Sequence, residues 1–184
     1  MATDGFRIHG GGYAGVVQIR AMAGAAGRGA VAGVVGVAGM TATEKLEQLV
    51  THRPNSYVPA HTLARLLGLS RADADSWRRN MLMHWGNGVV LGAVRGVMAE
   101  ANLRGPRAAL MHAPLRLTWD QVWENLTGAG APPWTWPRDE LVTDVFHKTV
   151  FSLVTGAVAD RLVDPLPTSS ASRSDPPSRL KGFA

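Results

Sequence analysis

Six ionisable side chains are the candidates for chemistry in this sequence, because each lies in or beside a segment that is otherwise apolar. An ionisable residue within an apolar helix usually faces the interior of a bundle or a cavity, where it pairs or moves protons. Histidine and carboxylate together could perform acid/base catalysis. We predict that the catalytic candidates are His84, Glu100, His112, Glu124, Asp144 and His147.

Asp144 and His147 are the most suggestive pair, because residues three apart share one face of a helix. A helical di-metal site would need two Glu-x-x-His motifs and further carboxylates, so this single Asp-x-x-His motif leaves metal binding undecided. The sequence contains no phosphate-binding loop and no dinucleotide fingerprint, and we predict no cofactor.

Simpler structural roles stay open for three of the candidates. His84 is either a binding residue or a buried histidine that is bonded to a carbonyl group. His112 stands two residues before Pro114 and is expected to end a helix, unless it takes part in the chemistry. Glu100 and Arg104 are four residues apart, which predicts an ordinary exposed ion pair.

Composition excludes several classes of protein. The 184 residues include no cysteine, which excludes a disulfide framework and a thiolate nucleophile. The net charge is +5, but the basic residues are dispersed and are not interleaved with aromatics, so we predict no nucleic-acid partner. Dispersed positive charge suits an anionic membrane surface.

Apolar periodicity and turn residues predict an all-α protein. The expected helices cover residues 13–50, a short stretch from Pro59 to Gly68, and residues 71–102, 118–128 and 137–163. Ser70 with Asp73, and Thr118 with Gln121, have the spacing of capping boxes that begin two of these helices.

The expected organisation is one helical bundle over residues 13–164. A flexible lead, residues 1–12, precedes it, and a disordered basic tail, residues 165–184, follows it. The fold class that we predict is a bundle of three to four long helices, packed through glycine and alanine and embedded in a membrane.

Glycine gives the main argument for a membrane. Six glycines lie between positions 24 and 39, and each costs about 1 kcal/mol relative to alanine in a helix in water. Membrane helices tolerate glycine because small residues let backbones approach closely. Pairs at that spacing predict contact with the lipid bilayer and a possible homo-oligomer through the glycine faces: Gly29 and Gly33, Gly88, Gly92 and Gly96, and Ser152 and Gly156.

Charge spacing argues in the other direction. The longest charge-free runs, residues 29–43 and 80–94, are shorter than the ~18 residues of a simple membrane span. Segment 145–163 is better suited, since its charges lie near its ends. A soluble helical bundle is the alternative.

Two arginines, Arg28 and Arg95, lie beside glycines in the small-residue helices. Each could pair with Asp144 or Glu100, or could bind a lipid phosphate.

Several short segments resemble a group of small, predicted integral-membrane proteins without assigned activity, and more distantly YagU-type inner-membrane proteins. The resemblance covers about residues 20–163 and implies a membrane location but no reaction. The segments that carry it are Glu44 to Gln48, Tyr57 to Leu63, His84 to Gly88, Leu103 to Pro106, Ala131 to Pro137, and Asp144 with His147.

Two functions follow as hypotheses. The first is a small helical membrane protein of unassigned activity. The second is an intramembrane or hydrophobic-pocket acid/base enzyme, of the isomerase, cyclase or hydrolase type, that acts on a lipid-like or polycyclic small molecule. The enzyme would be favoured if His84, His147 and one of Glu100, Glu124 or Asp144 met within about hydrogen-bonding reach around one cavity.

Overall fold

The computed structural model describes residues 11–166, which form five α-helices and no strand. The all-α class is confirmed, but the predicted count of three to four helices is wrong. The elements are α1 (Gly11–Thr51), α2 (Val58–Leu66), α3 (Trp77–Glu100), α4 (Gly105–Leu126), a short 3-10 helix (Pro133–Thr135) and α5 (Arg138–Leu162).

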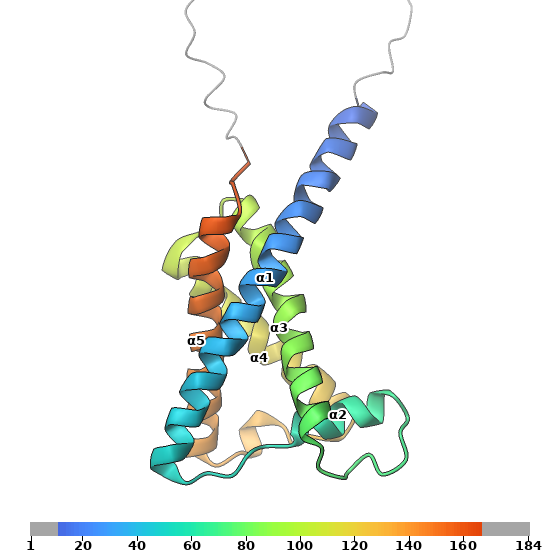
Figure 1. The fold of residues 1–184 in the computed structure, drawn as a ribbon, viewed down its shortest axis with the longest axis vertical. Helices are drawn as coiled ribbons and strands as arrows, with labels where there is room; N and C mark the ends of the chain where they lie inside the picture. Colours follow the sequence, from blue (N-terminus) through green and yellow to red (C-terminus); the bar gives the residue numbers. More distant parts are fainter. Residues whose placement is uncertain (1–10, 167–184) are drawn as a thin grey trace, which may run out of the picture.

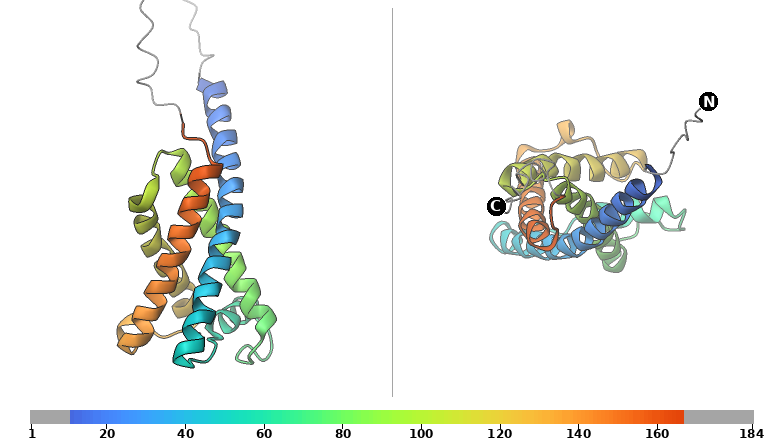
Figure 2. Two further views of the ribbon diagram at one scale, coloured as in Figure 1. Left: turned by 60° about the vertical axis from the view of Figure 1, so that its left-hand side comes forward. Right: turned by 90° about the horizontal axis from the view of Figure 1, so that it is seen from above.

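Helix α1 is the organising element of the bundle. It runs diagonally across the molecule and packs against α3 on one side and α5 on the other (Figure 1). Helix α4 packs mainly against α5, and α2 packs beside α3 at one end (Figure 2). The N-terminal part of α1 extends beyond the other helices.

The contact between α1 and α3 is made by glycine on both helices. A Cβ atom on Gly92 would lie 2.5 Å from the carbonyl oxygen of Gly29 and 2.5 Å from the Cα of Gly33. Gly96 meets the backbone of α1 at Ala25 and Gly29 in the same way, and a Cβ on Gly33 would collide with the carbonyl oxygen of Gly88. Because backbone meets backbone here, no other residue type fits without moving a helix.

Helix α5 meets α1 through a second set of contacts. A side chain at Gly36 would collide with the Thr155 hydroxyl and lie 3.0 Å from the Phe151 ring. Phe151 is fully buried and forms the apolar core with Val37 and Met40 of α1 and Leu91 of α3. The large-residue core is therefore small, and glycine and alanine occupy much of the remaining interface.

Two predicted helix starts are wrong. Helix α4 is continuous through Pro114, so Thr118 lies inside it and caps nothing. Pro114 is exposed, while its neighbour Ala113 is buried, so the helix is held on its inner face and tolerates the lost hydrogen bond on its outer face. Helix α3 begins after Ser76, whose hydroxyl accepts a bond from the Arg79 amide at 3.4 Å, rather than after Ser70.

The ends of the bundle differ slightly from the predicted bounds. Helix α1 already includes residues 11 and 12 of the expected lead. Residues 1–10 of that lead and residues 167–184 of the expected tail lie outside the described residues. The described chain ends at Leu166, whose amide donates to the Glu100 carbonyl at 3.0 Å.

Substitution Gly92→Leu should lower the thermal unfolding midpoint of the purified protein, because the new side chain would meet the backbone of α1. Overpacking of this kind typically costs about 1–3 kcal/mol. Gly86→Leu is the matched control, since Gly86 lies in the same helix with no atom within 4 Å of its Cβ position. A Gly92→Leu midpoint equal to or above that of wild type would refute the close helix contact.

Candidate functional site

A cavity of about 830 Å³ lies at the end of the bundle that carries α2. All five helices line it, together with the loops before α2 and after α4. Arg65 of α2 donates to the Thr127 carbonyl at 3.0 Å, which ties α2 to the second loop. The volume is within the range of small-molecule pockets, about 300–1,000 Å³. Apolar parts of the wall come from Met40, Trp77, Met81, Met83 and Trp136.

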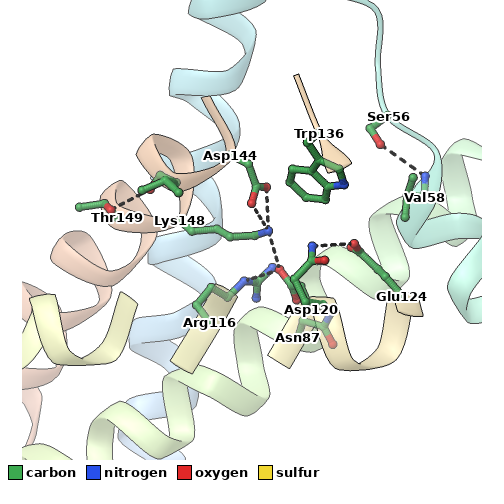
Figure 3. A network of polar contacts seen from close by, with 12 residues as sticks. Ser56, Val58, Asn87, Arg116, Asp120, Glu124, Trp136, Asp144, Lys148 and Thr149 are labelled. Carbon is green, nitrogen blue, oxygen red and sulfur yellow. Dashed lines mark hydrogen bonds and ion pairs between the residues drawn. The ribbon is translucent and has the colours of Figure 1, made fainter. Parts of the chain in front are cut away.

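A buried ion network lies in the wall of this pocket (Figure 3). The Lys148 ammonium is 2.7 Å from both carboxylate oxygens of Asp144 and 3.5 Å from Asp120. The Nε atom of Arg116 lies 3.0 Å from the same Asp120 carboxylate. Lys148, Asp120 and Arg116 are nearly inaccessible, so each charge depends on its partners for compensation.

Helix α3 supports the network through Asn87. Its side-chain amide donates to Asp120 at 3.1 Å, and its oxygen accepts from the Trp119 indole at 3.1 Å. Asp120 therefore has partners on three helices, namely α3, α4 and α5. This arrangement fixes both of its carboxylate oxygens.

Sequence reasoning missed Arg116, Asp120 and Lys148. A signal was present, because Arg116 and Asp120, and likewise Asp144 and Lys148, are four residues apart on one helix. Spacing of that kind predicts only a local pair. The joining of the two pairs through Asp120 and Lys148 comes from α4 packing against α5.

Several polar atoms in the pocket wall have no hydrogen-bond partner among the described residues. They are Arg116 Nη1, His84 Nε2, His147 Nε2 and Asn80 Oδ1, and each is buried. Leaving a buried donor or acceptor unpaired costs about 1–3 kcal/mol. The Arg116 guanidinium also stacks 4.9 Å from the centre of the Phe151 ring, which holds it in place without using its donors.

Glu124 is the pocket residue best suited to proton transfer. It lies near the end of α4, where the Gln121 amide donates to its carboxylate at 3.1 Å. Burial raises the pKa of Glu124 from its ordinary value of 4.5 to about 7, and the neighbouring Lys148 opposes that rise. A carboxyl group with a pKa close to neutral pH can both take up and release a proton.

The structure brings four of the six predicted catalytic residues together. His84, Glu124, Asp144 and His147 line the same pocket, although they come from α3, α4 and α5. Asp144 is occupied by its bonds to Lys148, whereas the two histidines keep unpaired Nε2 atoms.

His112 lies outside the pocket and does not end a helix. It is fully buried within α4, and its Nε2 is 3.0 Å from the Leu91 carbonyl of α3. Its Nδ1 is 3.2 Å from the Ser152 hydroxyl of α5. Since a carbonyl only accepts, Nε2 donates and Nδ1 accepts from Ser152. His112 therefore links three helices.

Glu100 also lies outside the pocket, at the other end of α3, and the predicted exposed pair with Arg104 is not formed. Glu100 is only 4% exposed, while Arg104 donates to the carbonyls of Val163 and Asp160. Arg95, predicted to pair with Asp144 or Glu100, is fully buried and donates to Asp160 at 2.8 Å. These contacts fasten α3 to the end of α5.

Arg28, which was also predicted to pair with Asp144 or Glu100, has a different partner. Arg28 lies 3.5 Å from Asp164, and both side chains are exposed. Such an exposed pair contributes about 0–1 kcal/mol.

Among residues 11–166, no group of three or more His, Asp or Glu side chains is arranged to hold a metal ion.

Substitution Glu124→Gln should stabilise the protein at about pH 8 and leave it unchanged at about pH 4. The folded protein holds the Glu124 proton more tightly than the unfolded chain, because its pKa rises from 4.5 to about 7. Folding stability therefore falls as pH rises through this window, and glutamine removes that loss. Thermal midpoints at the two pH values test this, with Glu140→Gln on the exposed rim as control. Equal midpoints of wild type and Glu124→Gln at about pH 8 would contradict the assignment.

The chain matches no protein-family model, no curated protein and no solved structure. The resemblance to YagU-type proteins therefore stays a prediction.

Proposed function

We propose that this chain is a membrane-embedded helical protein that binds a small apolar molecule in the pocket beside Lys148. The observation that carries the proposal is an inverted distribution of polarity. Several charged side chains are buried inside the bundle, while large apolar side chains are exposed on the outside of its long helices.

The outward faces of all four long helices are apolar. Each carries large hydrophobic side chains that are at least 39% exposed: Val31, Val34 and Val35 on α1, Val89, Val90 and Val94 on α3, Leu110, Met111 and Leu115 on α4, and Phe146 and Leu153 on α5. Helices α1 and α5 are long and apolar enough to cross a membrane, and only 33% of each apolar window is buried. The core helix of a soluble protein would be mostly buried, so this exposure favours lipid as the surroundings.

The length of the apolar surface also fits a membrane. Between Arg28 and Glu44, α1 has no charged residue, a rise of about 24 Å at 1.5 Å per residue. Between Glu140 and Arg161 of α5 the rise is about 31 Å, and the charged residues within it are buried or paired with buried partners. These lengths approach the ~30 Å of a bilayer core. Helix α4, which carries Glu124, is not among the described helices that are long and apolar enough to cross a membrane.

Glycine contacts between helices also favour a membrane location. Close approach of α1 and α3 at Gly29 and Gly92 is the packing that small residues provide between membrane helices. Because these glycines are used within one chain, a homo-oligomer through glycine faces would need others. Gly24 and Gly27 of α1 have no atom within 4 Å of their Cβ positions and are the candidates.

Pocket binding follows from three features of the wall. The volume suits a small molecule, apolar methionine and tryptophan side chains line part of it, and buried nitrogen atoms at Arg116, His84 and His147 lack partners. The apolar part of a bound molecule would lie against the methionine and tryptophan side chains, and a polar atom on it would bond to the unpaired nitrogen atoms.

One observation favours the alternative, an acid/base enzyme in the same pocket. Glu124 has a pKa of about 7, and it shares the pocket with His84 and His147. A carboxylic acid poised near neutral pH is the general acid or base that an isomerase, cyclase or hydrolase would need. In both proposals the small molecule must first bind in this pocket.

The expressed protein should remain in the membrane fraction after washes with high salt and with alkaline carbonate, and detergent should release it. These washes remove proteins that are held by charge alone, whereas the apolar belt requires lipid or detergent. Recovery of a stable, monodisperse protein without detergent would overturn the membrane proposal.

Bromododecane, which quenches tryptophan fluorescence on contact, should quench the protein saturably in lipid nanodiscs. Trp136 lines the pocket, so Trp136→Phe should remove a large part of the saturable quenching. Trp134 lies in the same loop but is 84% exposed and outside the pocket, so Trp134→Phe should retain it. Quenching that rises linearly with bromododecane, or that is equal in the two variants, would reject binding in the pocket.

A further inference from the structure

The unpaired groups in the pocket indicate what kind of head group its ligand carries. Arg116 is only 1% exposed and lines the pocket, yet its Nε and Nη1 atoms are buried without a hydrogen-bond partner among the described residues, and Nε has only the ion pair with Asp120. Arginine has donors and no acceptor, so its complement is an oxygen that accepts. His84 adds a second unpaired nitrogen in the same wall.

The carboxylate oxygens of the ion network are already occupied. Asp144 gives both oxygens to Lys148, and Asp120 receives bonds or ion pairs from Asn87, Lys148 and Arg116. A cationic head group would therefore find no free carboxylate in the network. The groups of the network that remain without a partner are N–H donors of Arg116.

Charge balance argues against an anionic head group. Within the network the positive charges of Arg116 and Lys148 are matched by Asp120 and Asp144. The whole pocket wall contains four Lys or Arg residues and five Asp or Glu residues, so it has no surplus of positive charge. An anion bound at Arg116 would leave a buried negative charge without compensation, which is unfavourable.

We propose that this pocket binds the uncharged carbonyl oxygen of an apolar molecule, such as a long-chain ketone or a quinone, through a hydrogen bond from Arg116. The apolar body lies against Met40, Met83 and Trp136, which line the same cavity. This inference rests on the proposed binding function and adds the chemistry of the ligand. In the enzyme alternative, the same bond would polarise the carbonyl for proton transfer by Glu124.

Competition against bromododecane in nanodiscs separates the possible head groups. The competitors are tridecanone, dodecanoate and tridecane, which share a similar chain and differ in carrying a carbonyl, a carboxylate or no head group. Tridecanone should displace the quencher at a concentration about tenfold lower than the other two, because a hydrogen bond to a charged donor is worth about one order of magnitude in affinity.

Variants assign the effect to Arg116. Arg116→Lys keeps the positive charge beside Asp120 but changes the fork of donors, and His84→Leu leaves the ion network intact. Arg116→Lys should reduce the preference for tridecanone over tridecane about tenfold while bromododecane still binds. His84→Leu, which tests the second nitrogen, should preserve most of the preference. Unchanged thermal midpoints show that each variant is folded.

The outcomes separate the two proposals. Saturable quenching with equal competition by all three molecules, or with dodecanoate as the strongest competitor, overturns the carbonyl inference and leaves pocket binding in place. A tridecanone preference that survives in Arg116→Lys and disappears in His84→Leu overturns the role of Arg116. Absence of saturable quenching in the wild type overturns the binding function and the inference with it.

Discussion

Backbone contact between α1 and α3 is the constraint on which the rest of the structure depends. Gly29 and Gly33 meet Gly88, Gly92 and Gly96 so closely that a Cβ on Gly92 would overlap the opposite backbone. Figure 1 shows the two helices diverging from this contact toward the end that carries α2. The pocket lies in that widening space, because residues beyond the glycines, such as Met40 and His84, form its wall.

The buried ion network is the second determinant of the structure, and it depends on the packing of the helices. Lys148, Asp120, Asp144 and Arg116 compensate one another only while α4 and α5 hold their present register. Removing one partner from a buried pair typically costs about 3–5 kcal/mol, because the other charge is left without compensation. The same network leaves Arg116 Nη1 without a partner in the wall of the cavity, so the side chains that stabilise the bundle also form the polar part of that wall.

Buried polar side chains lie at both ends of the bundle. At the end that carries Asp160, Arg95 and Arg104 donate to Asp160 or to nearby backbone carbonyls, while Arg95 Nε and Glu100 Oε2 are buried without a partner. At the pocket end, Arg116 and the two histidines retain unpaired atoms beside a cavity of about 830 Å³. Unpaired buried atoms occur at both ends, and the cavity beside them is what sets the pocket end apart.

The sequence by itself determined the all-α class, the approximate positions of α1, α2 and α5, and the glycine positions at which helices meet, because periodicity, prolines and glycine spacing are local signals. Four of the residues that it singled out, His84, Glu124, Asp144 and His147, line one cavity, since ionisable residues stand out in apolar segments. It missed the continuity of α4 through Pro114, where packing of the inner face outweighs a local helix breaker. Only the tertiary structure decided that His112 and Glu100 lie outside the pocket and that Arg116, Asp120 and Lys148 join it. The physical reason is that pairing between α4 and α5 depends on the register of two packed helices, and spacing along one chain does not encode that register.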